Sequence, residues 1–514
     1  MPRPQPPGTV ATNRRARHDY EILETVECGI VLRGTEVKTL RQGKASLQDA
    51  YAVVEGGDVM LYMQIPEYSH AGYATHEPLR PRKLLLHREQ IDRLAQRVRE
   101  KGLTLVPLRL YFSSQLVNVN IGHQHPKLIE AIKEQVDRLC TVAPFHANDA
   151  RSEAARLICE VAAEKIDKSQ LNMVFFTNGG AEATENAARM ARLHTNRLKV
   201  LSHYRSYHGG TNGAISMTGD PRRWASEPGM PGVVKFWGPY AYRSAFHSTS
   251  EAEECQRALA HLDDVLMVEG GHTVAAILIE TVVGTNGILV PPDGYLQGIR
   301  ERCDRHGIVM ICDEVMAGFG RCGEWFAFQK WGVQPDLVCF AKGVNSGYLP
   351  LGGVVISQNI ADTFRDRAFP GGLTYSGHPL ACASAVASIN IFKEEGIVEH
   401  ARMLGTDVIA PGLEKLQANH PSIGEVRGLG VFWALDLVTD RATRQPLVPY
   451  NSTGADAKPM GDLAAACKQR GLWPFTHFNR LHVVPPCTAT VDEVTDGLAI
   501  LDEALTVADA FYTG

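Results

Sequence analysis

The amino-acid sequence predicts an α/β fold: a mostly parallel sheet covered by helices, followed by a smaller C-terminal lobe and preceded by a small β-barrel. Three observations support this prediction. After residue 112, apolar runs suited to buried strands alternate with amphipathic helical segments. Several of these runs end in a polar residue, as buried parallel strands do at the carboxyl edge of a sheet. Before residue 113, short alternating strands surround a single helix.

The first 112 residues have the pattern of a small barrel. Residues 1–12 are rich in proline and are expected to form a disordered tail. Short strands are expected between residues 20 and 62, where Gly56-Gly57-Asp58 would form a hairpin turn. Apolar residues at helical spacing predict a helix over 87–102. Residues 103–112 are expected to form another strand.

The remaining residues alternate strand and helix, which predicts a parallel sheet. From about residue 378 the chain becomes mainly helical. We therefore expect a large domain over 113–375 and a C-terminal helical and small domain over 376–514. The strands are expected at 172–177, 274–280, 308–314 and 336–341, with helices at 181–195 and 293–307.

Composition excludes several classes of protein. With 514 residues and ordinary apolar and charged fractions, the chain has room for two or three domains. No apolar run approaches the roughly 18 residues of a membrane span, and the N-terminus lacks the apolar stretch of a signal peptide. The 11 cysteines are scattered without CxxC pairs, so neither a zinc site nor a disulfide framework is indicated. A cytoplasmic protein without bound metal is expected.

Two polar side chains end neighbouring apolar runs, 29 residues apart. Asp313 ends IVMICD and is followed by Glu314, and Lys342 follows DLVCFA. An amine and a buried carboxylate at one sheet edge are what pyridoxal phosphate chemistry requires: the amine forms a Schiff base, and the carboxylate keeps the pyridine nitrogen protonated. Taken singly, such a lysine is more often a solvated surface group, and such an acidic pair is more often a helix cap or a metal ligand.

Two further motifs could hold such a cofactor. Gly179 and Gly180 lie between a strand and a helix, where backbone N–H groups and the helix dipole can bind a phosphate. The alternative is a plain tight turn. Tyr207 could stack on a flat ring with His208 beside it, or could be a half-buried loop aromatic.

Six motifs occur along the chain in this order: TNGGAEATENAARMAR, YRSYHGG, ILIETVVGTNGI, ICDEVMAGFGRCGEW, DLVCFAKGVNSGYLPLGG and GLTYSGHPLA. These motifs and their order resemble the class III aminotransferases. This family contains the ω-amino acid and amine transaminases and belongs to the fold type I pyridoxal phosphate enzymes. The resemblance covers about residues 113–514. It implies a pyridoxal 5'-phosphate enzyme that moves an amino group from an ω-amino acid or amine, taurine-like or β-alanine-like, to a keto acid such as pyruvate.

The resemblance also implies roles for single residues. Lys342 would be the Schiff-base lysine and would move the substrate proton, and Asp313 would hold the pyridine nitrogen. Val315 and Tyr207 would pack on the two ring faces. Thr374 would reach the phosphate bound by the neighbouring subunit, which implies a homodimer with shared active sites. The other predicted cofactor-binding residues are Gly179, Gly180, Ala181, His208 and Glu280.

The chain departs from the family pattern at the substrate site. Many members have an arginine just before the paired prolines, where this chain has His482, with Arg480 two residues earlier. Alternation along a strand would put both on one face, so either could bind an anionic group. The alternative for Arg480 is a surface arginine.

Residues 13–112 resemble a second family. NRRARHDYEILETVECGIVLRGTEVKTLRQGKASLQDAYAVV and HEPLRPRKLLLHREQIDRL are similar to small protein B, the tmRNA-binding protein of bacterial ribosome rescue, which has an OB-type barrel. Residues 1–112 carry 17 Lys and Arg against 13 Asp and Glu, and the rest carry 35 against 44. A small basic excess suits RNA or a solvated face. The implied RNA contacts are Arg14, Arg15, Arg17, Arg80, Arg82 and Lys83.

Both resemblances break at Phe112 and Ser113, inside a domain on each side and without a flexible linker. The closing part of the barrel, its basic tail and the usual first segment of the aminotransferase are expected to be missing. Natural fusions join whole domains through linkers, so we interpret the junction as a recombination or gene-assembly product. Three hypotheses remain open: a transaminase, an RNA-binding protein of trans-translation with an inert enzyme-like appendage, or a chimera that does neither.

Overall fold

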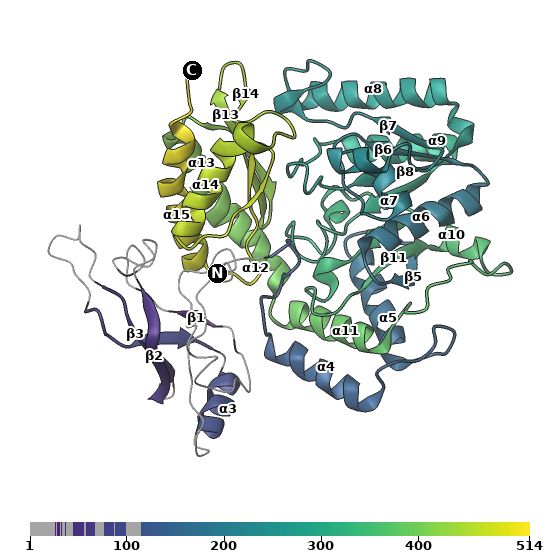
Figure 1. Ribbon diagram of the computed structural model, residues 1–514. Coiled ribbons are helices and arrows are strands. Elements are labelled where there is room, and N and C mark those ends of the chain that lie inside the picture. Colours follow the sequence, from purple (N-terminus) through teal and green to yellow (C-terminus); the bar gives the residue numbers. More distant parts are fainter. Residues whose placement is uncertain are drawn as a thin grey trace.

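The computed structural model describes residues 26, 28–30, 32, 36, 45–55, 58–66, 77–86, 88–98 and 115–514 (Figure 1). The expected disordered tail, Gly56 and Gly57 of the hairpin turn, the strand over 103–112 and the junction at Phe112 and Ser113 lie outside the described residues. The predictions for Arg14, Arg15 and Arg17 also lie outside them.

The N-terminal segment forms a small antiparallel sheet, consistent with the predicted partial barrel. Its described strands occur in the order β1-β4-β3-β2. Glu55 pairs with Asp58 across the predicted hairpin. Side chains such as Leu61 and Ile91 form a buried core between the sheet and helix α3. The elements are β1 Gly29–Ile30, β2 Ser46–Glu55, β3 Asp58–Gln64, β4 Arg82–Leu85 and α3 Arg88–Val98.

The main sheet has seven strands within residues 115–514, in the order β5-β11-β10-β9-β8-β6-β7. The pairs from β10 to β7 are parallel, and β11 runs antiparallel to both of its neighbours. The predicted mostly parallel sheet is therefore confirmed. The strands are β5 Leu171–Thr177, β6 Lys199–His203, β7 Val233–Phe236, β8 Val274–Glu280, β9 Val309–Asp313, β10 Leu337–Phe340 and β11 Gly352–Ser357.

Helices cover this sheet because the strands are apolar on both faces. All seven residues of β8 and all five of β9 are buried. Helix α6 packs on one face through small side chains such as Ala183, Ala187 and Ala191, which allow close approach. The helices of this part are α4 Pro126–Arg138, α5 Asp149–Ala163, α6 Gly180–Thr195, α7 Asn212–Met217, α8 Glu251–Glu269, α9 Tyr295–His306 and α10 Gln358–Thr363.

The C-terminal part adds a second sheet. Its strands occur in the order β12-β13-β16-β15, with β14 paired to β13, and helices cover it (Figure 1). A capping box between Thr490 and Glu493 starts the last helix. The elements are α11 Pro379–Glu394, α12 Ile397–Met403, α13 Ala410–Asn419, β12 Ile423–Leu429, β13 Phe432–Asp440, β14 Gln445–Pro446, α14 Lys458–Gln469, β15 Phe475–His477, β16 Arg480–Val483 and α15 Val491–Asp509.

Among the described residues, no helix is both long and apolar enough to cross a membrane. All 11 cysteines are free thiols, and most are buried.

Candidate active site

Three functional side chains come from three neighbouring strands of the main sheet. Strand β8 ends at Glu280, β9 ends at Asp313, and β10 leads into Lys342. Glu280 pairs with Asp313 across β8 and β9, and Cys339 pairs with Asp313 across β9 and β10. Because these strands are parallel, their carboxyl ends meet at one edge of the sheet. The structure therefore brings Glu280, Asp313 and Lys342 together.

Asp313 is held in a fixed orientation. It is buried, and its Oδ2 lies 2.7 Å from Nδ1 of His208, while its Oδ1 accepts a hydrogen bond from the Val315 N–H at 3.0 Å. His208 is also buried, and its Nε2 has no hydrogen-bond partner among the described residues. A carboxylate fixed on both oxygens is a preorganised partner for a cation.

Glu280 is buried close to this carboxylate. Its two oxygens accept hydrogen bonds from the backbone N–H groups of Tyr207 and Gly284, each at 2.8 Å. Burial, together with the neighbouring charge of Asp313, raises the pKa of Glu280 to about 8. The side chain therefore connects the loop of Tyr207 to the loop that follows β8.

Lys342 begins a short 3₁₀ turn over Lys342–Val344 and has a φ of 46°. This left-handed conformation is costly for a residue other than glycine, and it is maintained here by the surrounding fold. Burial lowers the pKa of the Lys342 amine to about 8, although Asp313 and Glu280 act in the opposite direction. A much larger fraction of the amine is therefore neutral and nucleophilic near neutral pH than for an exposed lysine.

The predicted phosphate turn lies at the start of α6. A Cβ on Gly180 would lie 2.8 Å from Cγ1 of Val315, and a Cβ on Gly209 would lie 2.4 Å from Cβ of Ala181. The turn, the loop after β9 and the Tyr207 loop are therefore packed together without room for larger side chains. The first N–H groups of α6 have no partner within the helix and can receive an anion.

The other predicted residues are placed as follows. Tyr207 is half-buried, and the Arg222 guanidinium lies 3.5 Å from its ring centre. Thr374 is exposed in a turn. Arg480 and His482 are buried on β16, where Arg480 lies 3.5 Å from Asp436, so the surface alternative for Arg480 is wrong.

The basic residues of the N-terminal sheet are placed differently from the prediction. Arg82 is fully buried: its Nε donates to Glu36 at 2.9 Å, Nη1 to the Met63 carbonyl at 2.7 Å and Nη2 to the Pro78 carbonyl at 3.0 Å. The prediction that Arg82 contacts RNA is wrong, because an RNA phosphate cannot reach a buried guanidinium whose donors are used. Arg80 also donates to Glu36, at 2.8 Å, and Lys83 is exposed beside Asp58.

The residues at the sheet edge fit pyridoxal 5'-phosphate. An amine with a lowered pKa, a fixed carboxylate, an orphaned buried nitrogen on His208 and a glycine-lined helix start suit this cofactor. Fold and site together define a pyridoxal-phosphate enzyme of fold type I.

The family follows from the comparison with known proteins. Residues 109–505 match the family model "Aminotransferase class-III", and the chain belongs to this family. Residues 10–137 match the model "SmpB protein". The two predicted resemblances are therefore confirmed: most of the chain matches the aminotransferase model, and its first part matches the SmpB model. The two matches overlap between residues 109 and 137.

Relatives include the taurine–pyruvate aminotransferase of Bilophila wadsworthia, which is 32% identical over 76% of this chain and 86% of that protein. The aminotransferase YhxA of Bacillus subtilis, whose function is uncharacterised, is 34% identical over 74% of this chain and 82% of that protein. Among solved structures, the taurine:2-oxoglutarate aminotransferase of Bifidobacterium kashiwanohense, in complex with pyridoxal phosphate and glutamate, has a TM-score of 0.74 and 43% identity. That structural match covers 78% of this chain and 89% of that one.

The chain is therefore a pyridoxal-phosphate-dependent aminotransferase, as the sequence motifs predict. When bound, the cofactor supplies an electron sink that makes the proton on the amine-bearing carbon of a substrate acidic.

Proposed function

We propose that this transaminase takes an ω-amino acid with a terminal acid group, such as taurine or β-alanine, as its amino donor, and a keto acid such as pyruvate as its acceptor. One observation supports this class of amino donor. Arg480 is buried on β16 with Nε and Nη1 unused in hydrogen bonds to the described residues, and Gly287, in the loop after Glu280, lies against it. A guanidinium in such a position suits a sulfonate or a carboxylate.

In this proposal, the residues of the site have the following roles. Gly179, Gly180 and Ala181 bind the phosphate, Tyr207 and Val315 cover the ring faces, and Asp313, oriented by His208, holds the ring nitrogen. Lys342 carries the cofactor and moves the proton, which suits a lysine whose pKa is lowered to about 8. Glu280 supports the Tyr207 loop. Arg480 and His482 line the side where the acid group of the donor binds.

We further propose that the enzyme is a homodimer. Thr374, the residue expected to reach a phosphate, is exposed in its own chain, and its neighbour Tyr375 is 64% exposed. A second subunit would cover both side chains and would give Thr374 a phosphate to bind.

The donor class is tested with the purified full chain supplied with pyridoxal phosphate. We expect alanine to form from pyruvate with taurine or β-alanine, with kcat/KM at least about tenfold higher than for 1-propylamine, which lacks an acid group. Replacing pyruvate by 2-oxoglutarate identifies the acceptor. Equal use of taurine and 1-propylamine would contradict the donor class, and no amine consumption at all would contradict the activity.

A second function is proposed for residues 13–112, because the SmpB model matches this segment. RNA binding would depend on exposed basic residues such as Lys83 and not on buried Arg82. We expect the full chain to bind tmRNA in a filter-binding assay, with affinity that falls as salt rises and a few-fold weaker binding for Lys83→Gln, because each phosphate contact contributes separately. Equal binding of tmRNA and an unrelated RNA of the same length would contradict this function.

A further inference from the structure

An excess of positive charge is buried between the main sheet and the C-terminal sheet. It is arranged around Asp436 of β13, which is fully buried. Asp436 Oδ1 accepts hydrogen bonds from Arg243 at 2.6 Å and from Asn479 at 2.8 Å, and its Oδ2 accepts one from the Tyr240 hydroxyl at 2.7 Å. Its hydrogen-bonding capacity is therefore largely used by these three groups.

Two further arginines share the same carboxylate at a longer distance. Arg427 and Arg480 each lie 3.5 Å from Asp436 Oδ2, and Arg427 also pairs with Glu425. Nη2 of Arg427 and Nε and Nη1 of Arg480 are buried without a hydrogen-bond partner among the described residues. Both ring nitrogens of the buried His482 lack one as well. Buried donors of this kind normally have a partner, so the cluster has donors available to an anion.

Arg205 completes the cluster without forming an ion pair to a carboxylate of the described residues. Its guanidinium lies 4.7 Å from the centre of the Tyr240 ring, and that of Arg427 lies 4.8 Å from the same centre. Within the part of the chain that the structure describes, Arg205 makes no hydrogen bond or ion pair. Four arginines (205, 243, 427 and 480) therefore share two carboxylates, Asp436 and Glu425. Of the four, Arg205 is the one that forms no ion pair with either carboxylate.

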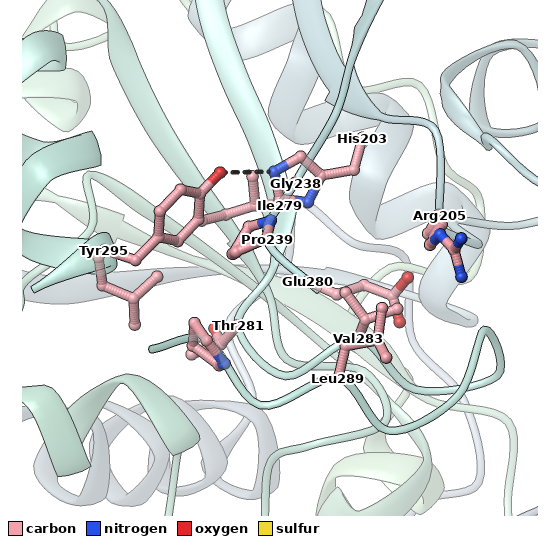
Figure 2. A pocket seen from close by; sticks show the side chains of 12 residues that line it. His203, Arg205, Gly238, Pro239, Ile279, Glu280, Thr281, Val283, Leu289 and Tyr295 are labelled. Carbon is pink, nitrogen blue, oxygen red and sulfur yellow. Dashed lines mark hydrogen bonds between the residues drawn. The ribbon is translucent and has the colours of Figure 1, made fainter. Parts of the chain in front are cut away.

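Arg205 also lies next to the cofactor-binding residues. It follows β6 and is two residues before Tyr207. Figure 2 shows Arg205 and Glu280 lining the same small cavity of about 20 Å³. On its outer side the cluster is followed by Phe478, whose ring centre lies 5.5 Å from the Arg480 guanidinium and 4.6 Å from the ring centre of Tyr450, which is 58% exposed. Burial raises the pKa of the Tyr450 phenol, while the nearby charges of Arg205 and Arg480 lower it. The cluster is therefore open to solvent on one side and close to the reaction centre on the other.

We propose that Arg205, supported by Arg480, binds the acid group of the amino donor, a sulfonate or a carboxylate, and so determines the substrate class. This inference rests on the proposed function for the identity of the donor. Arg480 is oriented and partly neutralised by Asp436, so it acts mainly as a positioning residue. Arg205 supplies the uncompensated charge, because its planar guanidinium can donate two parallel hydrogen bonds to one acid group.

The direct test is binding of substrate-like anions that lack an amine. Isethionate represents the sulfonate and 3-hydroxypropionate the carboxylate, and calorimetry on the cofactor-loaded full chain measures their binding. We expect at least one of these anions to bind to the wild type. Arg205→Gln should weaken the affinity for that anion at least about 30-fold, and Arg205→Lys should restore part of it. Arg257→Gln removes the same charge from the exposed face of α8 and should leave anion binding unchanged. Unfolding temperatures close to that of the wild type show that the variants fold.

Kinetics provide a second measurement. For Arg205→Gln, kcat/KM with taurine or β-alanine should fall at least about 30-fold, mainly because KM rises. The value of kcat/KM with 1-propylamine should change less than about threefold. Unchanged anion binding in Arg205→Gln, or no binding by the wild type, would overturn the inference even if taurine is transaminated. Anion binding that depends on Arg205 in a protein that consumes no amine would uphold the anion site and contradict the proposed activity.

Discussion

Replacing Lys342 by alanine is expected to abolish transamination, with a loss of about 10⁴-fold or more in kcat. The reason is that Lys342 is the amine placed at the sheet edge beside Asp313 and Glu280, with a pKa lowered to about 8 by burial. The measurement is alanine formation from taurine and pyruvate, together with an absorbance spectrum after addition of pyridoxal phosphate. The band of the lysine-bound cofactor should be present in the wild type and absent in the variant.

Lys330→Ala is the matched control, because Lys330 is exposed and lies outside the site. It should keep both the absorbance band and the activity. If Lys342→Ala retained the band of a lysine-bound cofactor, another lysine would carry the cofactor and the assignment would be wrong.

Replacing Asp313 by asparagine is expected to lower kcat about 10³-fold. Asparagine keeps the size of the side chain and removes the charge that would hold a protonated ring nitrogen. The same change should also affect Lys342. Because Asp313 stabilises the charged amine, its removal should lower the pKa of Lys342 below about 8. The rate at which the cofactor-free protein captures pyridoxal phosphate should then rise at a lower pH than in the wild type.

The pH profile of cofactor capture is followed by absorbance. It distinguishes the loss of kcat and the lowered pKa of Lys342 from simple unfolding. Asp366→Asn, at an exposed position, is the control and should leave the profile unchanged. A capture profile that moved to higher pH in Asp313→Asn would mean that Asp313 does not act on the charge of Lys342.

The region around the junction matches both family models. The two family matches overlap over residues 109–137. Helix α4, Pro126–Arg138, lies in this overlap except for its last residue, and it packs against α11 in the aminotransferase part of the structure. The overlap region after residue 115 is therefore built into the enzyme's fold.

Much of the cofactor site could be predicted because it depends on local patterns. A fully apolar run of five to seven residues defines a buried strand, and parallel strands bring their carboxyl ends to one edge. Asp313, Lys342 and Glu280 could therefore be placed near one another from their positions at strand ends. The order of six motifs then identified the family.

The partners of single side chains could not be predicted in this way. Nothing in the sequence pairs His208 with Asp313, which lie 105 residues apart along the chain. The basic cluster that contains Arg82 suggested an RNA surface, but Arg82 itself is buried and donates hydrogen bonds to Glu36 and to the Met63 carbonyl. The YRSYHGG motif contains Arg205. The motif does not predict that Tyr240 lies against Arg205, or that Tyr240 donates a hydrogen bond to Asp436.

By itself, the sequence determined the class of fold, the family and the residues at the strand ends, because periodicity and strand order depend on neighbouring residues. The tertiary structure alone decided which charges are paired. Burial and hydrogen bonding depend on segments that are far apart in the chain and become neighbours only when the sheets and loops pack. For this reason Arg82 is a structural residue, while Arg205 forms no ion pair with the described residues and lines the same cavity as Glu280.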